Sequence, residues 1–150
     1  MTDHHEFHDG ALEGFWLDGP AAHIHIRTIS DERFTAVANG VAALSADGFK
    51  AGNIIFEVVT RESAEVTRQD LKDLYELGEG AAGESQRDRL MEKIHAQALQ
   101  LLEINPSYGG RCLVLASSIE FVSRAAWIKQ LFPCRLDVQS RDNIPTTPAE

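Results

Sequence analysis

Residues 109–132 read Gly-Gly-Arg-Cys-Leu-Val-Leu-Ala-Ser-Ser-Ile-Glu-Phe-Val-Ser-Arg-Ala-Ala-Trp-Ile-Lys-Gln-Leu-Phe, and this stretch decides the expected fold. Residues 112–116 form an unbroken apolar run of strand length, which is typical of a strand buried on both faces. Ser117 stands three residues before Glu120, the spacing of a capping box at the start of a helix. Five apolar residues then follow at helical spacing, namely Phe121, Val122, Ala125, Ile128 and Phe132. A strand leading directly into a helix predicts an α/β protein.

Length and charge narrow the class of protein. The 150 residues are enough for one domain with a real core. The formal net charge of −9 speaks against nucleic acid and against an anionic membrane surface as partners. The sequence has neither a leader pattern nor a run near the roughly 20 apolar residues that a membrane-spanning helix needs. We therefore expect a cytoplasmic protein.

Two cysteines, Cys112 and Cys134, bear on the redox state. Cys112 lies inside the apolar run, so a buried, reduced thiol is the favoured interpretation. A disulfide between the two is the alternative.

The N-terminal part of the chain is rich in histidine. Residues 1–11 hold His4, His5 and His8 among acidic residues, and we expect a flexible, solvated terminus, with zinc or nickel binding as the alternative. Residues 12–18 and 21–28 predict two strands joined at a turn that contains Gly19.

The second of these strands alternates. Ile24 and Ile26 would share one face, while His23 and His25 would share the other with Arg27. The histidine face is a candidate metal or anion site. The alternative is the partly exposed side of a sheet.

The middle of the chain predicts helices around one buried strand. Ser30 would cap a helix whose core stripe is Phe34, Val37, Ala38, Val41 and Ala42. Residues 54–59 predict a buried strand. Thr67 and Asp70 resemble a capping box at the start of a helix that ends in the glycine-rich residues 78–83.

A long helix is expected next. It would carry Leu90, Met91, Ile94, Ala98, Leu101 and Leu102, and Asn105-Pro106 would end it. Residues 135–139 predict a short last strand, and residues 141–150 a disordered tail. The expected fold is one α/β domain over residues 12–140, with a small mixed sheet of about four or five strands and helices packed mainly on one face.

This order of elements resembles the STAS superfamily, the anti-sigma-factor antagonist or SpoIIAA-like proteins, including its uncharacterised bacterial single-domain members. Three stretches carry the resemblance: Phe49-Lys-Ala-Gly-Asn-Ile-Ile-Phe-Glu-Val, Val66-Thr-Arg-Gln-Asp-Leu-Lys-Asp-Leu, and Gly110-Arg-Cys-Leu-Val-Leu-Ala-Ser through Arg124-Ala-Ala-Trp, with residues 135–138 closing the sheet. The resemblance covers roughly residues 12–140. It implies a small sheet with helices mainly on one face and a surface built to dock a protein partner.

The chain departs from that family at the phosphorylation motif. Antagonists that work by phosphorylation carry an Asp-Ser-Ser/Thr-Gly-Leu type motif after the strand that corresponds to residues 54–59. Here the chain reads Thr60-Arg-Glu-Ser-Ala-Glu-Val, so Ser63 is present but the aspartate, the second hydroxyl residue and the glycine are missing. The resemblance implies a partner-binding or switch loop at Arg61, Glu62, Ser63 and Thr67.

Motifs for catalysis are absent from the sequence. It contains no Walker loop, no Gly-x-Gly-x-x-Gly, no Cys-x-x-Cys, no His-Glu-x-x-His and no Gly-x-Ser-x-Gly. The free amides of a helix start at Ser117 and Ser118 are a candidate anion or ligand site.

We therefore expect a non-enzymatic regulatory or protein-interaction module without a cofactor, and a sheet with an uncovered face is compatible with a homodimer. One alternative is a small-molecule or lipid carrier with a pocket between sheet and helices. A metal-binding protein that uses His23 and His25 is the other.

Overall fold

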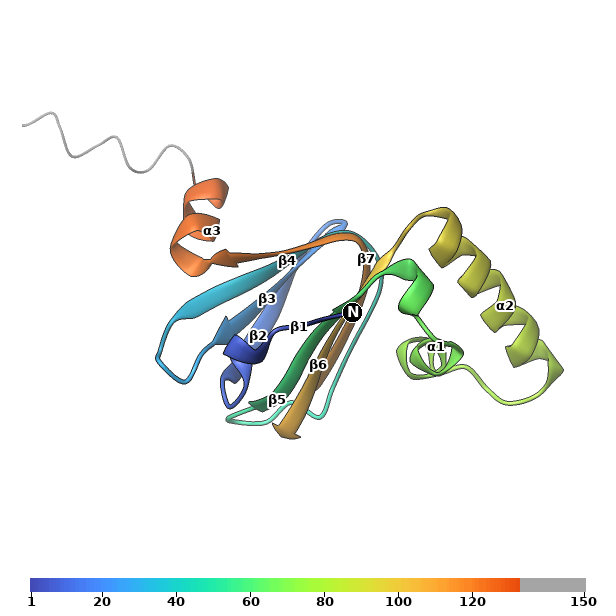
Figure 1. Ribbon diagram of the computed structural model, residues 1–150, viewed down its shortest axis with the longest axis horizontal. Helices are drawn as coiled ribbons and strands as arrows, with labels where there is room; N and C mark the ends of the chain where they lie inside the picture. The colour runs from blue at the N-terminus through green and yellow to red at the C-terminus, as the bar shows by residue number, and fades with distance from the viewer. Residues whose placement is uncertain (133–150) are drawn as a thin grey trace, which may run out of the picture.

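The computed structural model describes residues 1–132, and the largest part of its regular structure is one antiparallel sheet (Figure 1). Its strands are β1 (Thr2–Asp3), β2 (Ala11–Asp18), β3 (Ala21–Arg27), β4 (Arg33–Asp47), β5 (Ile54–Arg61), β6 (Gln100–Tyr108) and β7 (Arg111–Ser123). The helices are α1 (Arg68–Tyr75), α2 (Ala81–Ala96) and α3 (Arg124–Leu131), with single 3₁₀ turns η1 (His5–Phe7) and η2 (Ser63–Glu65). The expected α/β fold with a small mixed sheet and helices on one face is wrong, and so is the fold that the STAS resemblance implies.

The sheet closes on itself. Its strand order is β1-β5-β2-β3-β4-β7-β6, and β5 also pairs with β6. One edge of β5 thus pairs with β6, and the N-terminal segment bonds to its opposite edge. There the His4 amide donates to Val58 O at 2.9 Å, and the Asp9 amide donates to Ile55 O at 3.0 Å. Of the segment expected as a flexible terminus, Thr2, Asp3 and Ala11 thus lie in strands of the sheet.

The interior of the closed sheet holds the main core. Every second residue of β3 points into it, and Ala22, Ile24 and Ile26 are fully buried there. This confirms the alternation expected for that strand, because period-2 geometry sends neighbouring side chains to opposite faces. The other strands and η1 complete the core with Phe7, Leu12, Ala36, Ala38, Ile55, Val58, Leu102, Ile104, Cys112, Val114 and Ala116.

A second core lies on the outer face of β6 and β7, under α1 and α2. Leu101, Leu113 and Leu115 face outward there and pack against Leu71, Leu74, Leu77, Ile94, Val66 and Leu99. Figure 1 shows α1 and α2 together on one side of the sheet and α3 at its opposite end. The start of α1 confirms the expected capping box, since Thr67 accepts from the Asp70 amide and Asp70 accepts from the Thr67 amide.

The helix expected after Ser30 is wrong, because residues 33–47 form the long strand β4. Phe34, Ala36 and Ala38 face the interior, whereas Thr35 and Val37 face outward. The apolar residues fit both a helical and a strand period, and pairing of β4 with β3 and β7 decides for the strand.

The expected long helix is correct only in its first part. Helix α2 ends at Ala96, and Ala98 then takes a left-handed conformation with φ of 49°. The chain continues as β6, so Leu101 joins the outer core and Leu102 the interior core. Pro106 lies inside β6 where the register with β5 shifts, a position that tolerates a residue without an amide donor.

The deciding stretch holds a longer strand than expected. The buried strand at residues 112–116 is confirmed, but β7 continues to Ser123, where it still pairs with Phe34 of β4. The capping box predicted at Ser117 is therefore wrong. Ser123 caps α3 instead, accepting from the Ala126 amide at 3.2 Å.

Two further expectations concern cysteine and the C-terminus. Cys112 is a buried free thiol, and its burial raises its pKa to about 12. Cys134, the short strand at residues 135–139 and the tail at residues 141–150 lie outside the described residues. Among residues 1–132, no helix has the length and apolar character to cross a membrane.

Candidate functional site

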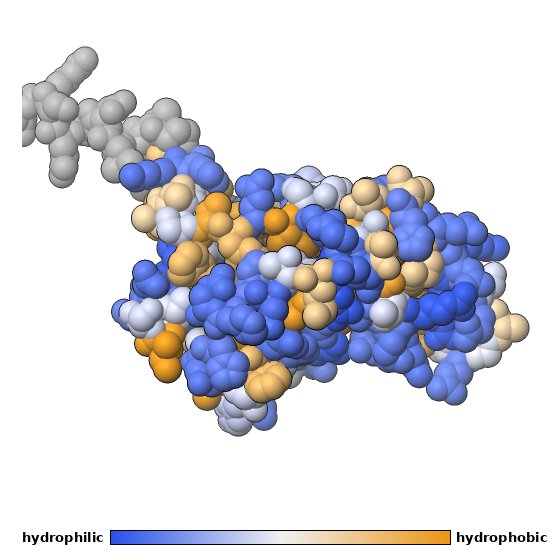
Figure 2. Space-filling view, viewed as in Figure 1, coloured by the Kyte–Doolittle hydropathy of each residue, from blue (hydrophilic) through white to orange (hydrophobic). Residues whose placement is uncertain are grey.

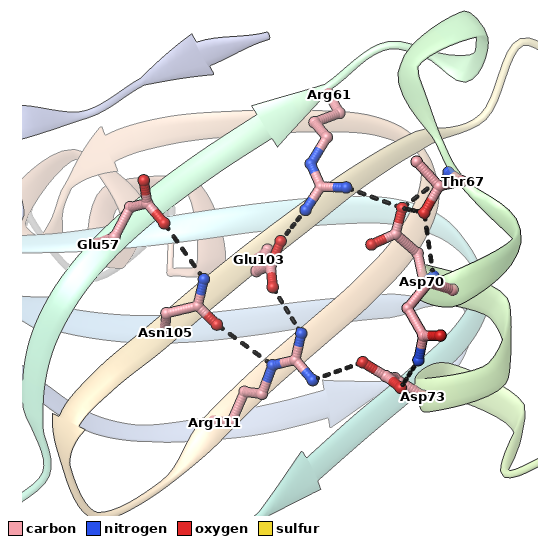
Figure 3. A network of polar contacts seen from close by, with 9 residues as sticks. Glu57, Arg61, Thr67, Asp70, Asp73, Glu103, Asn105 and Arg111 are labelled. Atoms are coloured by element: carbon pink, nitrogen blue, oxygen red, sulfur yellow. Dashed lines mark hydrogen bonds and ion pairs between the residues drawn. The ribbon is translucent and has the colours of Figure 1, made fainter.

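A network of charged side chains covers the outer face of β5, β6 and β7 (Figure 3). Glu103 of β6 lies at its centre and is only 6% exposed. It accepts hydrogen bonds from Arg61 of β5 and from Arg111 of β7, the latter at 2.6 Å. Charge-assisted bonds of this kind are among the strongest that side chains form.

The same two arginines reach α1. Arg61 donates to Asp70 at 2.7 Å, and Arg111 donates to Asp73 at 2.9 Å. The Arg111 guanidinium is the main cause that holds the pKa of the Asp73 carboxyl below its usual range. Thr67 donates to Asp70 through both its amide and its hydroxyl, each at 2.7 Å. The network therefore fastens the first turns of α1 to the sheet.

Asn105 completes the network, and its geometry indicates a structural role. The Asn105 amide donates to Glu57 at 3.3 Å, and its oxygen accepts from Arg111 at 3.2 Å. Each charged group faces a complementary partner, so none is left as a reactive acid or base. This arrangement anchors α1 to the sheet.

The residues of the expected switch loop fall in and beside this network. Arg61 and Thr67 meet at the Asp70 carboxylate. Glu62 instead forms the capping box of η2 and accepts from Gln100 at 3.0 Å, while Ser63 is the first residue of η2. The structure thus brings together two of the four residues, and a partner-binding or switch role for this loop stays a prediction.

His23 and His25 lie on the outer face of β3, under α3. The Trp127 indole N–H donates to Nδ1 of His23 at 2.8 Å, and Nδ1 of His25 is hydrogen-bonded to the Thr35 hydroxyl at 3.2 Å. Trp16 stacks on the His23 ring with centroids 5.0 Å apart. In residues 1–132 no three His, Cys, Asp or Glu side chains are grouped to hold a metal ion. The metal site at these histidines stays a prediction without a third ligand.

Burial of the two histidines should make the stability of the fold depend on pH. Desolvation is the main cause that lowers the pKa of both below 6.5, so the folded state resists their protonation. Because the unfolded chain binds these protons more readily, the free energy of unfolding should be highest above pH 6.5 and fall as the pH drops below it. Urea unfolding of wild type and His23→Gln between pH 7.5 and 5 measures this: the variant should lose part of the pH dependence. His5→Gln, at an exposed histidine, is the control and should keep all of it.

The candidate anion site at Ser117 and Ser118 loses its basis. Both residues lie in β7, where Ser117 Oγ donates to Gly40 O at 3.5 Å and Ser118 pairs with Asn39. The free amides of a helix start, which this site requires, are at Ser123 instead.

A polar cavity of about 380 Å³ lies between α1 and α2. Its three cations all have acidic partners: Arg68 is paired with Glu84 and Asp88, Lys72 with Glu79, and Arg87 with Glu84. This balance of charge leaves the cavity without an excess of positive charge for an anion.

The outer edge of β2 is the feature that the sequence interpretation missed. Beyond Leu12 this strand pairs with β3 alone within residues 1–132. Phe15, Trp16 and Leu17 are 39%, 44% and 53% exposed. An exposed apolar edge strand is a template for pairing with another strand. The signal in the sequence was three consecutive large apolar residues immediately before a turn.

Two residues of this edge have backbone amide and carbonyl groups without a partner strand. Asp18 and Ala21 flank the two-residue turn of the hairpin and form its closing hydrogen-bonded pair. Because hydrogen-bonded pairs alternate along an antiparallel ladder, Trp16 bonds to β3, whereas the amides and carbonyls of Phe15 and Leu17 point away from β3. We call these two residues, with Trp16 between them, the β2 edge.

A fixed aromatic ring borders the β2 edge. Asn53 holds the loop before β5, because its Oδ1 accepts from the amides of Lys50 and Gly110, each at 2.9 Å. The loop places Phe49 against Gly110, where a side-chain Cβ would come within 2.6 Å of the ring. Phe49 then meets Phe15 edge-on with centroids 5.7 Å apart. The surface around the β2 edge is thus held by a buried side chain, rather than being a loose loop.

Apolar side chains also reach the surface elsewhere. Figure 2 shows them in several places between hydrophilic residues, and not as one continuous area on this face. Ile54 and Phe56 of β5 and Tyr108 of β6 are exposed as well. Within residues 1–132, only the β2 edge combines exposed apolar side chains with two alternate residues whose backbone groups have no strand partner.

Comparison with known proteins finds no matching family model, no similar curated protein and no similar solved structure.

Proposed function

We propose that this protein is a non-enzymatic interaction module that binds an extended protein segment by adding it as a strand to the β2 edge. The observation that carries this proposal is the combination of exposed Phe15, Trp16 and Leu17 with the unpaired backbone groups of Phe15 and Leu17. In strand addition the main-chain hydrogen bonds supply affinity, and the alternate side chains supply specificity. A partner strand would therefore meet two different faces here.

The two faces of the β2 edge differ in chemistry. Phe15 and Leu17 lie opposite Ile24 and Ala22, so they share the face that turns toward the interior core. Trp16 lies on the other face, beside His23 and edge-on to Trp127 at 6.2 Å between centroids. A segment with apolar residues at alternate positions fits the first face, and an aromatic or aliphatic residue between them fits the second.

The rest of the chain supports binding over catalysis or transport. The space between the sheet and α1 and α2, where a carrier would hold its ligand, is packed with leucine and isoleucine side chains. The interior of the sheet is filled in the same way. The charged side chains around Glu103 are paired with one another.

Photo-crosslinking tests the proposal. A photoreactive phenylalanine at Phe49, which borders the β2 edge without belonging to it, should crosslink to a polypeptide when the protein is exposed to a lysate of its source cells. Leu17→Pro should abolish that product, because proline removes the amide donor that faces outward and leaves the bonds between β2 and β3 intact.

Leu17→Thr is the matched control. It alters the same side chain but keeps the amide, so the product should remain, in reduced yield. A product that persists in Leu17→Pro, with thermal unfolding unchanged, would contradict strand addition at the β2 edge, as would the absence of any polypeptide product.

A further inference from the structure

We infer that the strand which the β2 edge receives is β2 of a second copy of this chain, in an antiparallel pair whose two-fold axis passes beside Trp16. This inference rests on the proposed function and names the partner. Two identical chains then share an isologous interface, in which the same surface of each meets the other.

Hydrogen bonding of the backbone fits this register. With the axis at Trp16, Phe15 of one copy lies opposite Leu17 of the other, and the reverse. These are the two residues whose amides and carbonyls point away from β3, so each pair can exchange two N–H to O=C bonds. Trp16 faces its own copy as a non-hydrogen-bonded pair, which suits it because its backbone already bonds to β3.

The side chains fit this register as well. Phe15 meets Leu17 on one face, and Trp16 meets Trp16 on the other, so each apolar residue of the edge lies opposite an apolar residue. A shift of the axis to Phe15 would place Leu17 opposite Glu13, and a shift to Leu17 would place Trp16 opposite Asp18. Cross-strand apolar and aromatic pairs stabilise a sheet, which favours the register at Trp16.

Charge is compatible with the same register. The acidic residues that flank the edge do not face one another, since Asp18 lies opposite Gly14 and Glu13 opposite Gly19. Glu13 is already paired with Arg27 at 3.1 Å and with Arg124 at 3.3 Å. The net charge of −9 on each copy opposes association at long range, so salt should strengthen the dimer.

Sedimentation of the purified full chain over a range of concentrations is the first test. Wild type should form dimers, and Leu17→Pro should remain monomeric at the same concentration, while Leu17→Thr should dimerise more weakly. A wild-type protein that is monomeric at about 100 μM, where even a weak specific pair would assemble, would overturn the inference.

Charge pairing at the axis tests the register itself. Trp16→Arg and Trp16→Glu should each be monomeric, because the two-fold axis places like charges opposite each other. An equal mixture of the two variants should form mixed dimers. Dimers of either variant alone would show that Trp16 is not at the axis and would overturn the inference.

The remaining outcomes separate this inference from the proposed function. If wild type is monomeric and a chain without residues 133–150 is dimeric, the edge is occupied by the chain's own C-terminal segment, which overturns the dimer for the full chain. If purified wild type is monomeric and the crosslink from Phe49 joins it to a different protein, the second copy is excluded and strand addition stands. If no crosslink depends on Leu17, the proposed function itself fails.

Discussion

Replacing Glu103 with alanine is expected to lower the free energy of unfolding by about 3 kcal/mol, the lower end of the range for breaking a buried ion pair. Glu103 is nearly buried and joins Arg61 of β5 to Arg111 of β7, so its loss removes one carboxylate from both guanidiniums. The cost stays at the lower end because Arg61 keeps Asp70 and Arg111 keeps Asp73. Urea unfolding followed by tryptophan fluorescence measures the change.

An exposed ion pair supplies the control for Glu103. Asp88 pairs with Arg68 on the surface, where both side chains are more than half exposed. Asp88→Ala should therefore lower the free energy of unfolding by less than about 1 kcal/mol. Equal effects of the two variants would contradict the role of Glu103 as the centre of the network that holds α1.

The second large effect is expected at Leu102. This side chain is fully buried in the interior core, so Leu102→Ala should lower the free energy of unfolding by about 3 kcal/mol through lost burial and the cavity left behind. Leu90→Ala is the control, because Leu90 is only partly buried at the edge of the outer core and should cost about 1 kcal/mol. A small effect at Leu102 would contradict its place inside the closed sheet.

Leu102 also shows why the sequence misled the fold prediction. Leu101 and Leu102 both fit the apolar stripe of a helix that begins near Leu90, yet in β6 they point to opposite faces and enter different cores. Two buried faces make a strand apolar at every position, and such a run carries no period that distinguishes it from a helix. The same ambiguity between the two periods led to the helix that was expected where β4 lies.

Local signals were dependable where the structure they predict is local. The capping box at Thr67 and Asp70, the hairpin turn at Gly19 and the alternation of Ile24 and Ile26 are all found as expected. The capping spacing at Ser117 and Glu120 was wrong because β7 stays paired with β4 through those positions. Pairing between distant segments overrides a weak local preference, and one sequence does not reveal that pairing.

For the candidate sites too, the sequence indicates single residues but not the contacts between distant strands. Arg61 and Thr67 could be picked out from the sequence, but their meeting at Asp70, and the place of Glu103 between two arginines, follow only from the order of strands. The β2 edge was not foreseen, since an unpaired edge is a property of the whole sheet. Its apolar residues fall inside the strand predicted at residues 12–18, and their pattern does not tell a paired edge from an unpaired one.

Amide hydrogen exchange in β2 tests the central claim most directly. In the dilute monomer, the amides of Phe15 and Leu17 should exchange rapidly while that of Trp16, bonded to β3, exchanges slowly. When the protein is concentrated enough to form dimers, the amides of Phe15 and Leu17 should become protected as well. Slow exchange of all three in the dilute monomer, or unprotected Phe15 and Leu17 in the dimer, would contradict strand addition at the β2 edge.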